Sequence, residues 1–185
     1  TADYETLIKW WNKHAAKRPL FIGEDIERTA KYADKTNPNI NQMPAKYALH
    51  NQLPNVKGTV LWYAKAAVDN VGNYGSMLRN VYWKYPALQP SMPFIDGKAP
   101  KKVKRMKVLN IDGDMVLFWT APSGKSWKDM ATKYVVYRFE KGQKTDISNP
   151  MNIITITSDT YLKLPYQDGT KEYTYVVTAL DRMQN

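Results

Sequence analysis

The stretch that decides the fold is GTVLWYA at residues 58–64, a largely apolar run that follows the turn-like LPN at residues 53–55. Such a run, bounded by turn residues, is typical of a strand covered on both faces in a parallel sheet. A shorter run of the same kind, LFI, occupies residues 20–22. The sequence therefore predicts two buried strands, of which the second ends in the aromatic pair Trp62 and Tyr63.

Helical segments are predicted around these strands. Asp3 can cap a helix whose residues at i, i+3, i+4 and i+7 spacing form one apolar stripe. These residues are Tyr4, Leu7, Ile8, Trp11 and Ala15. Shorter helices are predicted over residues 44–51 and 74–83, the first of them opened by a proline. Helix and strand thus alternate along this half, and this order of elements is typical of a parallel β/α architecture.

From Pro86 onward the pattern changes. Prolines at 86, 90, 93 and 100 mark a linker, because proline cannot continue a helix. Beyond the linker, Asp112-Gly113 is typical of a tight hairpin. The predicted strands are residues 103–109, 115–120, 134–140, 153–157 and 173–180. With no helical periodicity between them, this half is predicted to be an antiparallel β-sandwich, and we place the domains at 1–97 and 98–185.

The composition is that of an ordinary globular protein and limits what the chain can be. Its 185 residues are too few for a complete eightfold β/α barrel, which needs about 250. A net charge of +10 permits a polyanionic partner without establishing one. The absence of cysteine excludes thiolate chemistry, and no apolar run reaches the length of about 18 residues that a membrane helix needs. The chain opens Thr1-Ala2-Asp3 and is expected to be an excised piece.

Four segments of the second half carry a resemblance: PKKV at 100–103, LFW at 117–119, YVVYR at 134–138 and YTYVVTALD at 173–181. On these segments, residues 99–185 resemble a fibronectin type III domain. In that family a buried tyrosine near the sheet crossover has its hydroxyl satisfied by upstream backbone, and a buried tryptophan lies on the second strand. The usual last strand is missing, which implies an unprotected edge or a very short final strand.

Five segments carry a second resemblance: WWNK at 10–13, PLFIG at 19–23, LPNVKGTVLWYAK at 53–65, PALQP at 86–90 and VTALDR at 177–182. On these segments the first half, together with the sandwich module, resembles the C-terminal end of the family 10-like glycosyl hydrolases, once grouped as a domain of unknown function, in the form found in gut Bacteroidetes. The resemblance implies a partial (β/α) barrel remnant, with last units at residues 19–51 and 58–83, followed by a fibronectin type III-like β-sandwich. It also implies that the catalytic carboxyl pair lies on earlier strands.

Polar residues follow the first predicted strand where a barrel delivers side chains to its cleft. Glu24 and Asp25 come directly after residues 20–23, and Arg28 is nearby. They are candidates for hydrogen bonding to substrate. The alternative is a solvated loop with an internal ion pair worth at most about 1 kcal/mol.

The second strand ends in Trp62, Tyr63 and Lys65, and Asn70 lies in the loop that follows. Because strand side chains alternate, one of the two aromatic residues is expected to face the barrel interior and the other the outer helices. Trp62 is then a candidate platform for a sugar ring, and the alternative is packing in the core. These four residues complete the predicted substrate-binding set, and no catalytic residue is predicted in this chain.

Metal, cofactor and nucleic-acid sites are not predicted. His14 and His50 have no carboxylate or cysteine at metal-ligand spacing. The basic run at residues 101–107 either binds phosphate or sulfate groups of nucleic acids or acidic glycans, or keeps an edge strand from aggregating. We favour the edge strand, because basic residues are spread over both halves of the chain.

The sequence therefore favours a C-terminal fragment of a secreted, periplasmic or cell-surface glycoside hydrolase acting on polysaccharide or oligosaccharide. The fragment is expected to be inactive alone, because glycoside hydrolysis needs two carboxyl groups close to the bound sugar. The alternatives are a non-catalytic carbohydrate-binding or adhesion module and a nucleic-acid-binding protein. We predict carbohydrate as the partner, no nucleic acid and no membrane insertion. A homodimer or strand exchange is expected to cover the open strand edges, unless the first half forms an independent α/β layer.

Overall fold

The computed structural model describes residues 3–32, 34, 36–37, 40–166 and 169–185, and it divides the chain into two compact units, Thr1–Lys84 and Tyr85–Asn185. The boundary lies ahead of the proline-rich linker, and Gly97 falls inside the second unit. Met92 N–H donates to the Met183 carbonyl at 2.9 Å, and Asn185 Nδ2 donates to the Asp96 carbonyl at 2.6 Å. The linker therefore belongs to the second unit because the C-terminal tail hydrogen-bonds to it.

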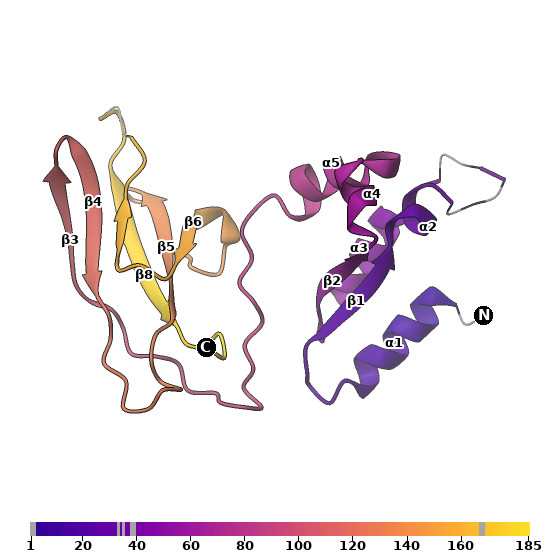
Figure 1. Ribbon diagram of the computed structural model, residues 1–185, viewed down its shortest axis with the longest axis horizontal. Helices are drawn as coiled ribbons and strands as arrows, with labels where there is room; N and C mark the ends of the chain where they lie inside the picture. Colours follow the sequence, from indigo (N-terminus) through magenta and orange to yellow (C-terminus); the bar gives the residue numbers. More distant parts are fainter. Residues whose placement is uncertain (1–2, 33, 35, 38–39, 167–168) are drawn as a thin grey trace. The chain divides into compact units, whose positions relative to one another are not determined.

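The first unit is built on two parallel strands, β1 (Leu20–Asp25) and β2 (Val56–Trp62), as the alternation of helix and strand predicts. Phe21 lies opposite Gly58 and Asp25 lies opposite Trp62, so both strands end at the same edge of the sheet (Figure 1). The helical segments are α1 (Tyr4–His14), α2 (Ile26–Ala30), α3 (Met43–Gln52), α4 (Ala64–Val68), η1 (Val71–Asn73), α5 (Tyr74–Met77) and the π-helical η2 (Leu78–Tyr82).

Helices cover one face of this pair. A single apolar cluster joins α2, α3, α4, α5 and η2 through Ile26, Ala30, Met43, Tyr47, Ala66, Tyr74 and Leu78, and Leu61 of β2 packs against it. On the other face Phe21, Val60 and Trp62 are all more than half exposed. The strands were predicted to be covered on both faces, and within the described residues of this unit they are covered on one. We call the exposed side, with Phe21, Val60 and Trp62, the open face.

Helix α1 contacts the unit along part of the predicted stripe: Ile8 and Ala15 are buried as expected, whereas Leu7 is exposed. Asn12 Oδ1 accepts from Asn55 N–H at 3.0 Å, and its carbonyl accepts from Asn55 Nδ2 at 2.8 Å. One turn earlier Ile8 is buried, whereas Trp11 is half exposed. The contact line therefore follows i, i+4, i+8 spacing, which turns Trp11 away from the unit.

The second unit consists of two three-stranded antiparallel sheets, with strand orders β3-β4-β7 and β6-β5-β8. Asp112 and Gly113 both have positive φ between β3 and β4, as a tight hairpin of the primed type requires, so the hairpin prediction is confirmed. The strands are β3 (Lys104–Ile111), β4 (Asp114–Thr120), β5 (Lys133–Glu140), β6 (Ile153–Thr157), β7 (Tyr161–Lys163) and β8 (Tyr173–Leu180), and the short helix η3 (Pro150–Asn152) precedes β6.

The two sheets share one core. Trp119 of β4, Tyr134 and Val136 of β5, and Val177 of β8 lie in the same buried cluster. Trp119 packs edge-on against Tyr134, with ring centroids 5.5 Å apart. Strand β3, which carries part of the basic run, is the end strand of its sheet and is exposed along its whole length. The edge-strand interpretation of the basic run agrees with this position.

Candidate functional site

The candidate site is the edge of the first unit at which β1 and β2 both end. The Trp62 indole is 73% exposed, and Tyr63, the next residue, is also more than half exposed. Asp25 is the partner of Trp62 across the two strands. Consecutive parallel strands bring their carboxyl ends to one edge, and in α/β proteins ligands bind there. An open indole and a carboxylate therefore lie side by side on this edge.

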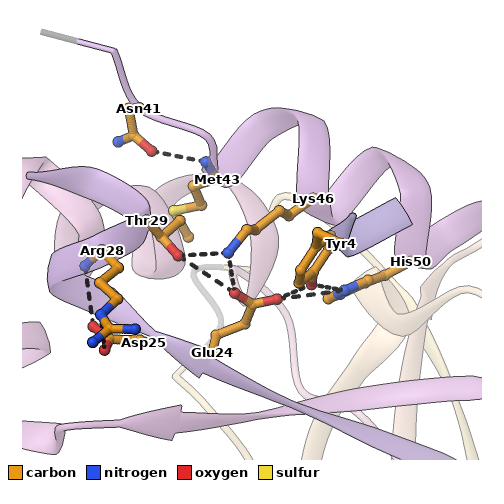
Figure 2. Close-up of polar contacts among 9 residues, drawn as sticks. All are labelled: Tyr4, Glu24, Asp25, Arg28, Thr29, Asn41, Met43, Lys46 and His50. Atoms are coloured by element: carbon orange, nitrogen blue, oxygen red, sulfur yellow. Dashed lines mark hydrogen bonds and ion pairs between the residues drawn. The ribbon is translucent and has the colours of Figure 1, made fainter. Parts of the chain in front are cut away.

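Asp25 and Arg28 are braced against each other. Asp25 Oδ1 accepts from the Arg28 backbone N–H at 3.0 Å and caps α2, and its Oδ2 lies 3.5 Å from Arg28 Nε (Figure 2). The capping bond explains why a helix begins directly after β1. The internal ion pair considered from the sequence is present, and the Arg28 side chain remains largely exposed beside the site.

Lys65 and Asn70 are engaged in local structure. Lys65 pairs with Asp69 one turn along α4, and this hydrogen bond raises the pKa of the lysine above its ordinary value. Asn70 lies in the left-handed region, and its Oδ1 accepts from Ser76 N–H at 2.8 Å. The Asn70 amide thus shapes the turn between α4 and α5, because its acceptor oxygen is already bonded to backbone.

Glu24 is separated from these residues. It is only 1% exposed, and because neighbours on a strand alternate, it lies on the opposite face of the sheet from Asp25. Its carboxylate accepts from the Tyr4 hydroxyl, from Lys46 Nζ at 2.7 Å and from Thr29 Oγ1 at 3.4 Å (Figure 2). Glu24 therefore lies among the helices rather than at the strand edge, although it was predicted as a substrate-binding residue.

The Glu24 cluster, formed by Tyr4, Glu24, Thr29, Lys46 and His50, joins three helices to β1. Lys46 Nζ also donates to Thr29 Oγ1 at 2.8 Å and lies 4.4 Å from the centre of the Tyr4 ring. Tyr4 gives its single proton to Glu24, so the 2.8 Å contact between Tyr4 and His50 requires His50 Nε2–H to donate. This contact assigns the Nε2-protonated tautomer to His50.

Burial controls the protonation of the cluster. Burial, reinforced by the hydrogen bond to Glu24, raises the pKa of Tyr4 above its ordinary value. Burial lowers the pKa of His50, although the nearby Glu24 carboxylate opposes this shift. His50 is therefore neutral at neutral pH, and the charges of the cluster are those of one carboxylate and one ammonium group. A closed, paired set of this kind braces helices and offers no free acid or base to a ligand.

Sequence reasoning missed Tyr4, Lys46 and His50 as partners of Glu24. Lys46 and His50 are four residues apart and so share one face of α3, which was the available signal. The sequence does not say that this face meets β1.

Comparison with known proteins gives a relationship for the whole chain. No family model matches it. Its sequence is 33% identical over 189 residues to a Bacillus subtilis (strain 168) protein named glycosyl hydrolase YngK, and the aligned region covers 100% of this chain and 36% of the relative. The chain is related to a glycosyl hydrolase. It spans about a third of the length of that relative.

Similarity to solved structures is weak. A structure of titin kinase with its flanking domains aligns with 48% of this chain, and the aligned part is 15% of the titin chain. The TM-score is 0.39 and the sequence identity is 18%. A cytokine receptor complex matches 45% of each chain at a TM-score of 0.33 and 20% identity. Neither likeness carries an argument about this protein.

Proposed function

We propose that the chain is part of a secreted, periplasmic or cell-surface glycoside hydrolase of the family 10-like group, in which the first unit forms one wall of the saccharide cleft. Trp62 is the platform on which a sugar ring stacks, and Asp25 and Arg28 provide polar groups for its hydroxyls. The observation that carries this proposal is the exposed Trp62 indole next to Asp25, at the edge where two parallel strands end.

The open face supports a role within a larger barrel. Parallel strands are normally covered on both faces, and in a (β/α) barrel the second face packs into the barrel interior. Here Phe21, Val60 and Trp62 leave that face apolar and exposed, and the related hydrolase is almost three times as long as the aligned region. We therefore infer that further strands cover Phe21 and Val60 of the open face in the complete enzyme and leave Trp62, at the strand end, open to the cleft. In the isolated chain a second copy covers Phe21 and Val60 as a homodimer.

Catalysis is assigned to residues outside this chain. Glycoside hydrolysis uses two carboxyl groups about 5–9.5 Å apart across the sugar. Asp25 is at the candidate edge, whereas Glu24 lies on the opposite face and is paired with Lys46. The chain alone is expected to bind saccharide without hydrolysing it, and turnover of aryl glycosides above the buffer rate would overturn this part of the proposal.

The second unit is proposed to be a fibronectin type III-like accessory sandwich. Two antiparallel sheets with strand orders β3-β4-β7 and β6-β5-β8 enclose the buried Trp119, which supports the assignment. Such a module braces the catalytic barrel or spaces it from other domains.

Binding measurements test the cleft wall directly. Calorimetric titration of the chain with a panel of neutral oligosaccharides should give about tenfold weaker binding for Trp62→Ala, equivalent to one stacking contact of about 1.4 kcal/mol. Trp10→Ala is the matched control, because Trp10 is also half exposed but lies on α1. Equal effects of the two substitutions would refute the role of Trp62.

A non-catalytic carbohydrate-binding or adhesion module is the second candidate, favoured by two adjacent exposed aromatic residues, Trp62 and Tyr63. The complete protein distinguishes the two. Hydrolysis of a bound oligosaccharide supports the enzyme, and binding without hydrolysis supports the module.

A further inference from the structure

The second unit contains a pocket that is independent of the strand edge in the first unit. Its volume is about 270 Å³, near the lower limit for small-molecule sites. It is lined by residues 98–101 at the end of the linker, by residues 123–125 in the loop after β4, and by Asp129. A pocket of this size accommodates one ring or one acidic group rather than an extended chain.

The walls are held by specific contacts. Lys98 Nζ bonds to Asp129 Oδ2 at 3.1 Å, while its backbone N–H donates to Asp96. Asp129 N–H in turn donates to the Ser126 carbonyl at 3.0 Å and closes a turn. A Cβ added at Gly124 would lie 2.9 Å from the Asp129 carbonyl oxygen, so loop and turn are in close contact. The pocket is thus formed within the second unit.

The charge in the pocket is unbalanced. Three lysines, Lys98, Lys101 and Lys125, face one carboxylate, and only Lys98 is paired with it. In the part of the chain that the structure describes, Lys101 and Lys125 make no ion pair. Clefts lined by one sign of charge concentrate the opposite ion. The unpaired ammonium groups therefore favour an anionic ligand.

An exposed aromatic ring lies in the turn from Ser126 to Asp129, next in the chain to the lining residues 123–125, although the ring itself is not part of the lining. Trp127, between Ser126 and Asp129, is 56% exposed. Lys128 Nζ and Arg182 Cζ are each 5.8 Å from the centre of its ring, within the range of a cation–π contact. An apolar ring next to lysines suits a ligand that is part apolar and part anionic, which a bare ion is not.

We propose that this pocket binds an acidic sugar residue, one that carries a carboxylate or sulfate group. Lys101 and Lys125 hold the acidic group, and Trp127 contacts the apolar face of the ring. The identity of the ligand as a sugar rests on the proposed function, whereas the anion preference rests on the pocket alone. The second unit then adds a subsite for acidic saccharides that is built from its own residues.

The experiment is a calorimetric titration of the whole chain with a trimer of galacturonic acid and, in parallel, with the neutral galactose trimer and inorganic sulfate. The double variant Lys101→Gln/Lys125→Gln should weaken binding of the acidic trimer by about tenfold, as expected for two exposed charge pairs. The control Lys141→Gln/Lys171→Gln removes the same charge from lysines that pair with Glu172 and Glu140. It should change binding less than twofold.

The outcomes separate the alternatives. Trp127→Ala should weaken binding of the acidic trimer and leave sulfate unchanged. Sulfate binding as tight as that of the trimer would reduce the pocket to a simple anion site, and equal losses in the two double variants would show diffuse charge instead of a site. A fourth titration uses a single-stranded oligonucleotide, and tighter binding of it than of the acidic trimer would overturn the assignment as well. If Trp62→Ala does not change the binding of neutral sugars and the acidic trimer still binds, the proposed cleft wall is refuted. The anion preference of the pocket would be unaffected by that result.

Discussion

Replacing Glu24 by glutamine should destabilise the first unit far more than any exposed ion pair does. The substitution keeps the side-chain volume and an acceptor oxygen but removes the negative charge that faces Lys46 Nζ at 2.7 Å. The Lys46 side chain is 15% exposed, so its ammonium group would lose its partner with little water to replace it.

The magnitude follows from burial. Breaking a buried pair by removing one partner costs about 3–5 kcal/mol. The remaining exposure of Lys46, and its 2.8 Å bond to Thr29 Oγ1, place this case at the lower end. We expect a loss of about 3 kcal/mol, or more than a hundredfold in the unfolding equilibrium. Glu5→Gln, which breaks the exposed pair with Lys9, should cost about 0.5 kcal/mol.

Native-state hydrogen exchange is the appropriate assay, because two units need not unfold in one transition. The free energy of opening at β1 and β2 amides reports on the first unit, and the amides of β5 are an internal reference that Glu24→Gln should leave unchanged. The double variant Glu24→Gln/Lys46→Met removes both charges and should recover part of the loss. A loss below 1 kcal/mol, or a double variant less stable than the single one, would refute the reasoning.

Three further results are expected. Burial lowers the pKa of His50, so below the ordinary value of about 6.5 the unfolded state binds more protons than the folded state, and the first unit loses stability as the pH falls. Hydrogen exchange at pH 5 and pH 7.5 measures this loss. The variant His50→Gln should abolish the share of the pH dependence that comes from His50. Gly75→Ala would place a Cβ 2.2 Å from a backbone oxygen of α4 and should cost over 1 kcal/mol by urea titration, whereas Gly23→Ala, with open space around its Cβ, should be nearly neutral. Trp119→Ala should destabilise the second unit by about 3–5 kcal/mol, and the exposed Trp127→Ala by under 1 kcal/mol, which differential unfolding of β5 amides can distinguish.

Local sequence was sufficient for several features of the fold. The apolar runs at residues 20–22 and 58–64 predicted two strands, and the helices between them predicted the parallel pairing that the structure has. Asp112-Gly113 predicted a hairpin because both residues tolerate positive φ, and both have it. These features depend on residues close together in the chain, so their signal is complete within a short window.

The division of roles between Glu24 and Asp25 depended on tertiary structure. Alternation along β1 requires that the two carboxylates face opposite sides, yet it does not say which side the helices cover. That side is decided by contacts from distant segments, since Tyr4 of α1 and Lys46 of α3 both reach Glu24. The sequence alone determined that helices and parallel strands alternate. Only packing determined which carboxylate is buried and which lies beside Trp62, because a buried charge needs a partner, and here that partner comes from a segment distant in the sequence.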